Sequence, residues 1–199
     1  MREALRRAFR ASDNRKMVEA LYRFLCEAWG ISPGLGFLMP AGYEQAHASY
    51  DPDNGSIHLN PTLLAGSRVA CAYYFLHEMR HAQQYLRPQD FPPEVTRGLS
   101  YVVQYDGKCF KRDSDGWKSC QLEGPEAYFT ELYLAQPHEL DAGDFAYETV
   151  RSLADAREAE ELEALYHFWQ PAYQVIRTAE MPMALDAVYR RIDAAIITP

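Results

Sequence analysis

The chain has 199 residues, 48% of them hydrophobic, and a formal net charge of −8. This length is enough to bury the core of one domain. An acidic chain without a basic run is not typical of a nucleic-acid-binding protein, and no apolar stretch reaches the ~18 residues that a membrane span requires. No apolar segment follows the basic residues at the start, so we expect a cytoplasmic protein with neither nucleic acid nor membrane as a partner.

Apolar periodicity and capping residues predict a mostly helical chain with a few strands. The expected helices cover residues 1–11, 13–29, 61–65, 67–86, 125–134, 137–154, 157–168, 171–178 and 184–196. The expected strands are 37–39 and the arms of two hairpins at 46–60 and 100–122, while the Pro-rich residues 87–99 are expected to form a loop. We therefore predict one α+β domain over 1–199, with 156–199 as a C-terminal helical extension.

The second hairpin brings two cysteines together. Its expected arms are 100–109 and 117–122, and a centre at residues 114–115 would place Cys109 directly opposite Cys120. A cytoplasmic location favours free thiols over a disulfide between them.

The longest predicted helix runs from Ser67 to Leu86 without Pro or Gly. The Ser at its start can accept a hydrogen bond from a free backbone N–H, and apolar residues cover much of its surface, which predicts a central, largely buried helix. It contains His77-Glu78-x-x-His81, in which the two histidines lie on one face, one turn apart. Zinc hydrolases hold their metal with two imidazoles at this spacing and activate its water with the carboxylate. We therefore predict His77 and His81 as Zn²⁺ ligands and Glu78 as the general base.

A catalytic zinc site needs a third protein ligand. The segment after Pro137 offers one, because Glu139 lies in the first turn of a predicted helix, where the helix dipole favours a carboxylate. Ala142, one turn further on, is small enough to let two helices approach closely. Asp141 is the alternative ligand. His138 lies about 100° round the helix from Glu139, so its side chain is expected to point elsewhere.

These two segments together resemble the gluzincin pattern, in which a Glu on a downstream helix completes a two-His, one-Glu zinc site. Here the His-Glu-x-x-His motif is followed by Glu139-x-x-Ala142-x-x-Phe145. The short chain is similar to the minimal gluzincins and the ImmA/IrrE-like metallopeptidases, and the resemblance covers roughly residues 43–150. It implies a zincin-like α+β fold, with a small antiparallel sheet or hairpins beside the motif helix. It also implies zinc peptidase activity, with Glu139 as the third ligand.

The chain departs from this pattern one turn after Glu139. Related enzymes carry an acid there that supports a ligand histidine, whereas this chain has Gly143. Asp141, Asp144 or neither fills that role. The extra hairpin between the motif and Glu139 leaves the route of the substrate open.

The pattern predicts a zinc-dependent endopeptidase that acts on a peptide or protein substrate. Glu78 is expected to take a proton from the metal-bound water and pass it to the leaving amine. A second group should stabilise the oxyanion, and the candidates are Tyr133 and His138. The strand Ser56–Asn60, just ahead of the motif helix, could pair edge to edge with an extended peptide. Endopeptidase is favoured over aminopeptidase because the Gly-x-Met-Glu-Asn segment of the aminopeptidase branch is absent.

Two other readings share the motif. Peptide deformylases also carry it on a helix, but their third ligand is a Cys from an upstream strand, whereas Cys71 lies on the motif helix itself. The non-enzymatic alternative is a metal-bound scaffold or regulator that binds a partner through its C-terminal helices. A structural site would close its fourth position with a protein ligand such as Asp141, His138 or a Cys, while an enzyme would keep that position open for water.

Overall fold

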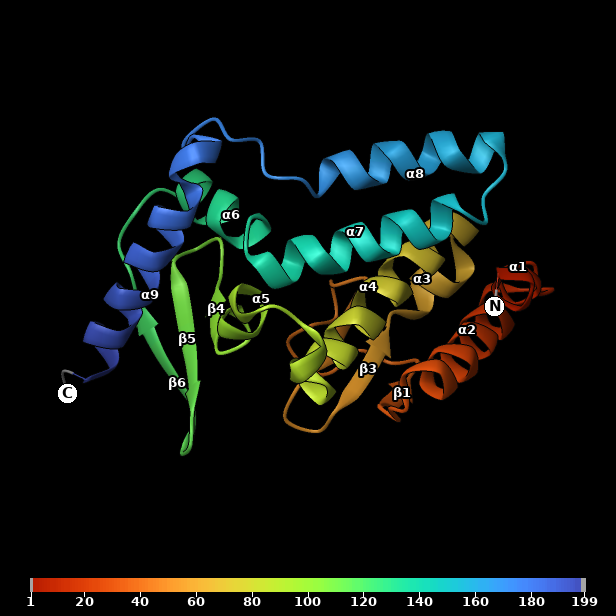
Figure 1. The fold of residues 1–199 in the computed structure, drawn as a ribbon, viewed down its shortest axis with the longest axis horizontal. Coiled ribbons are helices and arrows are strands. Elements are labelled where there is room, and N and C mark those ends of the chain that lie inside the picture. Colours follow the sequence, from red (N-terminus) through yellow and green to blue (C-terminus); the bar gives the residue numbers. More distant parts are fainter. Residues whose placement is uncertain (1, 198–199) are drawn as a thin grey trace. The chain divides into compact units, whose positions relative to one another are not determined.

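The computed structural model describes residues 2–197 and combines helices with two small sheets, which confirms the predicted α+β class (Figure 1). Its helices are α1 (Arg2–Phe9), α2 (Asn14–Trp29), α3 (Pro61–Ala65), α4 (Arg68–Leu86), α5 (Pro93–Gly98), α6 (Glu126–Leu134), α7 (Pro137–Arg151), α8 (Ala156–Phe168) and α9 (Met181–Ile197). Its strands are β1 (Gly34–Gly36), β2 (Ala48–Asp51), β3 (Ser56–Leu59), β4 (Tyr101–Val103), β5 (Lys108–Asp113) and β6 (Gly116–Gln121). Two 3-10 turns, η1 (Pro88–Asp90) and η2 (Thr178–Glu180), complete the described elements.

Contacts divide the described chain into two compact units. Unit 1 comprises residues 2–90 and 141–168, and unit 2 comprises 91–140 and 169–197. The boundary between Leu140 and Asp141 falls inside α7, which is one continuous helix. The single domain with a helical extension over 156–199 stays a prediction, and residues 198 and 199 of that extension lie outside the described residues.

The sheet of unit 1 has the strand order β1-β3-β2, with β1 parallel and β2 antiparallel to β3. The hairpin of β2 and β3 was predicted, but the sheet is mixed rather than antiparallel. The short strand expected at 37–39 was wrong: β1 lies just ahead of it, at Gly34–Gly36, and a side chain at Gly34 would overlap that of Ser56. Since β3 has partners on both sides, the prediction that Ser56–Asn60 offers a free edge is wrong.

The helix α4 is the centre of unit 1. It starts where predicted, because the Ser67 side chain accepts hydrogen bonds from the backbone N–H groups of Val69 and Ala70. It contacts α2, α8, β2 and β3. Twelve of its 19 residues are buried, which confirms the prediction of a central, largely buried helix.

The sheet of unit 2 is antiparallel, in the order β4-β5-β6. Its last two strands form the predicted hairpin, and Cys109 pairs with Cys120 in register. Both are free thiols, and burial raises the pKa of Cys109 to about 12. The expected single arm at 100–109 was wrong: it splits into β4 and β5, because the chain turns at Gly107, whose φ is 81°.

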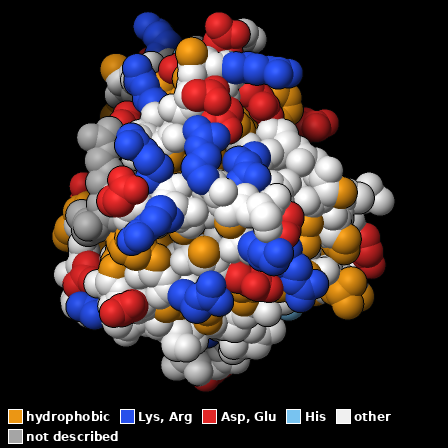
Figure 2. All heavy atoms as spheres, turned by 90° about the vertical axis from the view of Figure 1, so that its right-hand side faces the viewer, with side chains coloured by type: hydrophobic (Ala, Val, Ile, Leu, Met, Phe, Trp, Pro, Cys, Tyr) orange, Lys and Arg blue, Asp and Glu red, His pale blue; other side chains and the backbone are white. Residues whose placement is uncertain are grey.

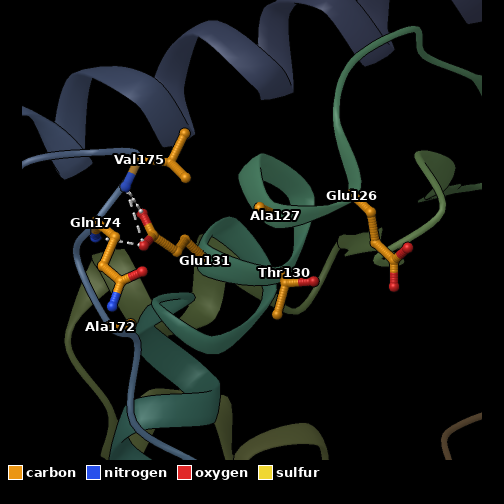
Figure 3. A pocket seen from close by; sticks show the side chains of 7 residues that line it. All are labelled: Glu126, Ala127, Thr130, Glu131, Ala172, Gln174 and Val175. Atoms are coloured by element: carbon orange, nitrogen blue, oxygen red, sulfur yellow. Dashed lines mark hydrogen bonds between the residues drawn. The ribbon is translucent and has the colours of Figure 1, made fainter.

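Two further elements of unit 2 differ from the sequence prediction. The residues expected to form a loop at 87–99 contain the short helix α5. The helix expected at 171–178 does not form. Instead, the Glu131 carboxylate on α6 accepts hydrogen bonds from the backbone N–H groups of Gln174 and Val175 (Figure 3). It also accepts one from Ile176, and these hydrogen bonds compete with those of a helix.

This contact predicts an acid-sensitive contribution of Glu131 to stability. Burial raises the pKa of Glu131, but the N–H donors of Ile176, Gln174 and Val175 outweigh burial and hold the pKa below its usual range. The stabilisation should be complete above the unfolded pKa, about 4.3, and disappear as the pH falls through the lower folded pKa. We expect Glu131→Gln to lower the free energy of unfolding at pH 7 by about 1–3 kcal/mol. Urea denaturation of both proteins between pH 3 and pH 7 checks this, and a difference that does not shrink in acid would contradict it.

Charges of both signs are interspersed on the face of unit 1 shown in Figure 2. Three ion pairs lie on or next to the first two helices, between Arg10 and Glu158, Arg15 and Glu19, and Lys16 and Asp13. None of the described helices combines the length and apolar character that crossing a bilayer would require.

Candidate metal centre

The candidate centre is built from the middle of α4 and the first turn of α7. His77, Glu78 and His81 follow one another on α4, where the helical repeat places the two histidines on one face. Glu139 is the third residue of α7, which begins at Pro137 as predicted.

Small residues and one salt bridge hold α7 in unit 1. Ala142 and Ala146 are fully buried, and a side chain at Gly143 would lie 3.5 Å from the Tyr73 hydroxyl of α4. Asp141, the first residue of α7 within unit 1, accepts two hydrogen bonds from Arg80 of α4 at 2.7 and 2.9 Å.

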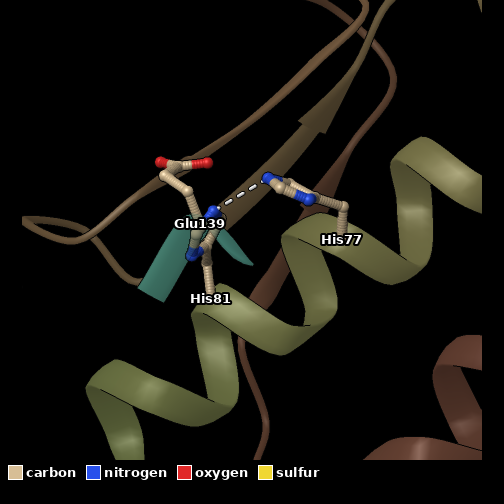
Figure 4. A group of neighbouring side chains, drawn as sticks. All are labelled: His77, His81 and Glu139. Atoms are coloured by element: carbon tan, nitrogen blue, oxygen red, sulfur yellow. Dashed lines mark hydrogen bonds between the residues drawn. The ribbon is translucent and has the colours of Figure 1, made fainter. Parts of the chain in front are cut away.

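The three predicted ligands lie together. One donor atom from each of His77, His81 and Glu139 falls within 4.8 Å of the other two (Figure 4). The two imidazoles face each other through their Nε2 atoms, 3.0 Å apart, with ring planes at 88°. Two nitrogens bound to one tetrahedral zinc ion lie roughly 3.3 Å apart, so a small adjustment of either ring would suit an ion between them.

The opposite nitrogen of His81 is also engaged. Its Nδ1 lies 2.9 Å from Oε1 of Gln84, one turn further along α4 and fully buried. Gln84 in turn donates its Nε2 to Asp141 at 2.8 Å. Metal-ligating histidines commonly donate their second ring N–H in this manner. The donor set of a catalytic zinc ion can consist of two imidazole nitrogens and one carboxylate, which are the groups found here. The hydrogen bond between His81 and Gln84 would orient one of the imidazoles.

Asp141, the predicted alternative ligand, is engaged by Arg80 and Gln84. Burial raises the pKa of Asp141, but hydrogen bonds from Arg80 and Gln84 outweigh burial and leave the pKa below its usual range. This carboxylate therefore supports His81 through Gln84. Asp144, the other acid considered for that role, accepts a hydrogen bond from the Tyr166 hydroxyl at 2.6 Å instead.

The remaining predicted residues lie at different depths. Glu78 is 8% exposed on α4, between the two histidines in sequence. His138 is 6% exposed, and its Nε2 lies 3.7 Å from Oε1 of Glu139, but it is not part of the group of three candidate ligands. Its ring packs against Gly98 of α5, where an added side chain would lie 2.5 Å from it. Tyr133 is half-buried on α6 in unit 2.

Sequence reasoning missed one aromatic pair. The exposed His47 packs its ring 4.6 Å from that of Tyr74. Tyr74 precedes Glu78 by one helical turn and therefore shares its side of α4. The one-turn spacing was available in the sequence, but nothing in it indicated that the loop before β2 would bring His47 there.

No family model, curated protein or solved structure matches this chain. The resemblance to gluzincins therefore stays a prediction. The residues of the site itself are therefore the basis for assigning a function.

Proposed function

We propose that this protein is a zinc-dependent endopeptidase with a zincin-like site, in which His77, His81 and Glu139 hold the metal. The observation that carries the proposal is the cluster of these three donor groups next to Glu78. The sequence motif supplies two donors and the base, and α7 supplies the third donor from a segment far along the chain. When bound, the zinc ion would act as a Lewis acid that polarises the scissile carbonyl and makes water more acidic.

The residues of this chain have separate tasks in such a reaction. Glu78 accepts the proton of the attacking water and delivers it to the leaving amine. His138, whose Nε2 lies 3.7 Å from the Glu139 carboxylate, is the better placed of the two predicted candidates to donate a hydrogen bond to the oxyanion. The role of Tyr133 remains a sequence prediction.

An extended peptide would bind a free edge of the sheet in unit 1. The central strand β3 has no free edge, so β1 and β2 are the candidates. We favour β2, because it contacts α4, the helix that carries the motif. Backbone hydrogen bonds along an edge strand bind peptides with little regard to side chains.

The alternative is a non-catalytic regulatory or interaction protein with a structural metal ion. The proximity of His138 to Glu139 favours it, since His138 could close the fourth position. Absorption spectra of the Co²⁺-substituted protein distinguish the two, because they respond to replacement of an oxygen donor by a nitrogen donor. A spectrum that changes on substitution of His138 by Gln, without loss of Co²⁺, would support the structural site.

The function is tested by metal analysis together with cleavage of a peptide library. We expect the purified protein to bind one equivalent of Zn²⁺ and to cut internal peptide bonds. We expect a chelator to stop cleavage and added Zn²⁺ to restore it. Cleavage that persists in excess chelator would exclude a metallopeptidase, and stoichiometric zinc without any cleavage of the library would favour the regulatory alternative.

A further inference from the structure

We propose that Gln84 and Asp141 are positioning residues that fix which ring nitrogen of His81 carries its proton. This inference rests on the metal site proposed above. It concerns three groups in sequence: the Asp141 carboxylate, the Gln84 amide and the His81 imidazole. Neither Gln84 nor Asp141 belongs to the group of three candidate ligands.

The direction of each hydrogen bond follows from the carboxylate. An ionised Asp only accepts, so the amide of Gln84 must present its NH₂ to Asp141, at 2.8 Å. The amide oxygen of Gln84 then faces Nδ1 of His81, at 2.9 Å. An oxygen acceptor requires a proton on Nδ1. In a neutral imidazole that leaves the lone pair on Nε2, the atom that faces His77.

Arg80 stabilises this orientation of the Gln84 amide by holding the Asp141 carboxylate in place. Its guanidinium contacts both oxygens of Asp141, and its third nitrogen donates to Oε1 of Gln83 at 2.8 Å. The bidentate pair fixes the plane of the carboxylate. The ring of Phe145 lies below the same guanidinium, with its centroid 5.0 Å away. Arg80 is therefore held on two sides and keeps Asp141 oriented toward Gln84.

Turning the Gln84 amide by 180° would move the proton of His81 from one ring nitrogen to the other. If Gln84 turned its NH₂ toward His81, Nδ1 would have to accept and Nε2 would carry the proton, so Nε2 could no longer bind a metal. The wild-type chain opposes this reversal because the amide oxygen would then face the Asp141 carboxylate. The two residues thus act on metal affinity without contacting the metal.

The first variant removes the acceptor. Gln84→Met replaces the amide by an apolar chain of similar length, and we expect it to weaken Zn²⁺ binding by about 10–100-fold, as loss of such an outer partner typically does. In the double variant Gln84→Glu with Asp141→Asn, the carboxylate at position 84 still accepts from His81. The amide at position 141 then donates to that carboxylate, so the hydrogen bond between the two positions is kept with its direction reversed. We expect it to recover most of the affinity. Asp144→Asn, on the same helix but outside this network, is the control and should bind Zn²⁺ as the wild type does.

Two measurements test the inference. Competition with a chromophoric chelator gives the Zn²⁺ affinity. Nitrogen-15 NMR of the metal-free protein, at a pH where His81 is neutral, shows which ring nitrogen is protonated. We expect the proton on Nδ1 in the wild type and the double variant, and a shift toward Nε2 in Gln84→Met. Circular dichroism confirms that each variant is folded.

The outcomes separate this inference from the proposed function. A wild-type His81 with its proton on Nε2, or a Gln84→Met protein that keeps both the wild-type tautomer and the wild-type affinity, would overturn the inference. The NMR measurement needs neither metal nor substrate. A protein that shows the expected tautomers but binds no Zn²⁺ would therefore refute the proposed function and leave the positioning of His81 intact.

Discussion

Glu78→Gln is expected to reduce peptide hydrolysis by about 10²–10⁴-fold while Zn²⁺ content stays at the wild-type level. The amide keeps the size of the side chain but cannot accept the proton of the attacking water. Glu78 is not among the three candidate ligands, so its replacement should not remove a metal donor. The measurement is kcat/KM on a peptide found in the library screen, with zinc quantified in the same preparation.

The matched control for this experiment is Glu27→Gln. Glu27 is an exposed residue of α2, and the same chemical change there should leave turnover unaltered. If Glu78→Gln hydrolyses the peptide as fast as the wild type, Glu78 is not the general base. If it loses zinc and activity together, the residue acts in binding the metal, and the division of tasks proposed here is wrong.

Glu139→Ala is expected to weaken Zn²⁺ binding by more than about 100-fold, beyond the effect of losing an outer hydrogen-bond partner. The loss removes one of three protein donors, so the two histidines alone would have to hold the ion. The dissociation constant from chelator competition, and the rise in melting temperature on addition of Zn²⁺, are the measurements. A ligand that binds only the folded state raises that temperature by an amount that grows with the logarithm of its affinity.

The same helix offers a control for this variant. Glu148→Ala makes an identical change at an exposed position of α7 and should bind Zn²⁺ normally. Asp141→Ala separates the two ligands considered from the sequence. If Asp141→Ala abolishes binding while Glu139→Ala retains it, the third ligand is Asp141, and its pairing with Arg80 must open when the metal binds.

Local signals were sufficient for the helix that carries the motif. Ser67 supplies a cap, and the absence of Pro and Gly up to Leu86 lets one helix continue through the motif. Pro137 fixes the start of α7 in the same local manner, which places Glu139 in the first turn. The three candidate ligands could therefore be named from the sequence.

Long-range pairing was not predictable from the same patterns. β1 joins β3 through a parallel register between residues that lie about twenty positions apart, and a three-residue strand containing two glycines has no apolar alternation to indicate it. The missing helix at 171–178 has a similar cause. Its backbone N–H groups bind Glu131, which lies more than forty residues earlier, and that competition is not visible in the segment itself.

The hydrogen bonds that join His81, Gln84 and Asp141 could be predicted from the sequence only in part. The position of Gln84, one turn after His81, was visible in the sequence, but its partner was not. Which acid of α7 would reach it depends on the rotation of that helix about its axis. In the structure Ala142 and Ala146 are buried, and Asp141 is the acid that accepts the hydrogen bond of Gln84.

The placement of Glu139 at a helix end has a consequence for the rate at which a bound metal would exchange. His77 and His81 lie in the buried middle of α4, where opening requires much of unit 1 to unfold, whereas the first turn of a helix can fray alone. Of the three groups that would hold a metal, the Glu139 carboxylate would therefore be the first to open. Exchange kinetics would then depend on the opening of a single helical turn and be largely independent of the global stability of the protein.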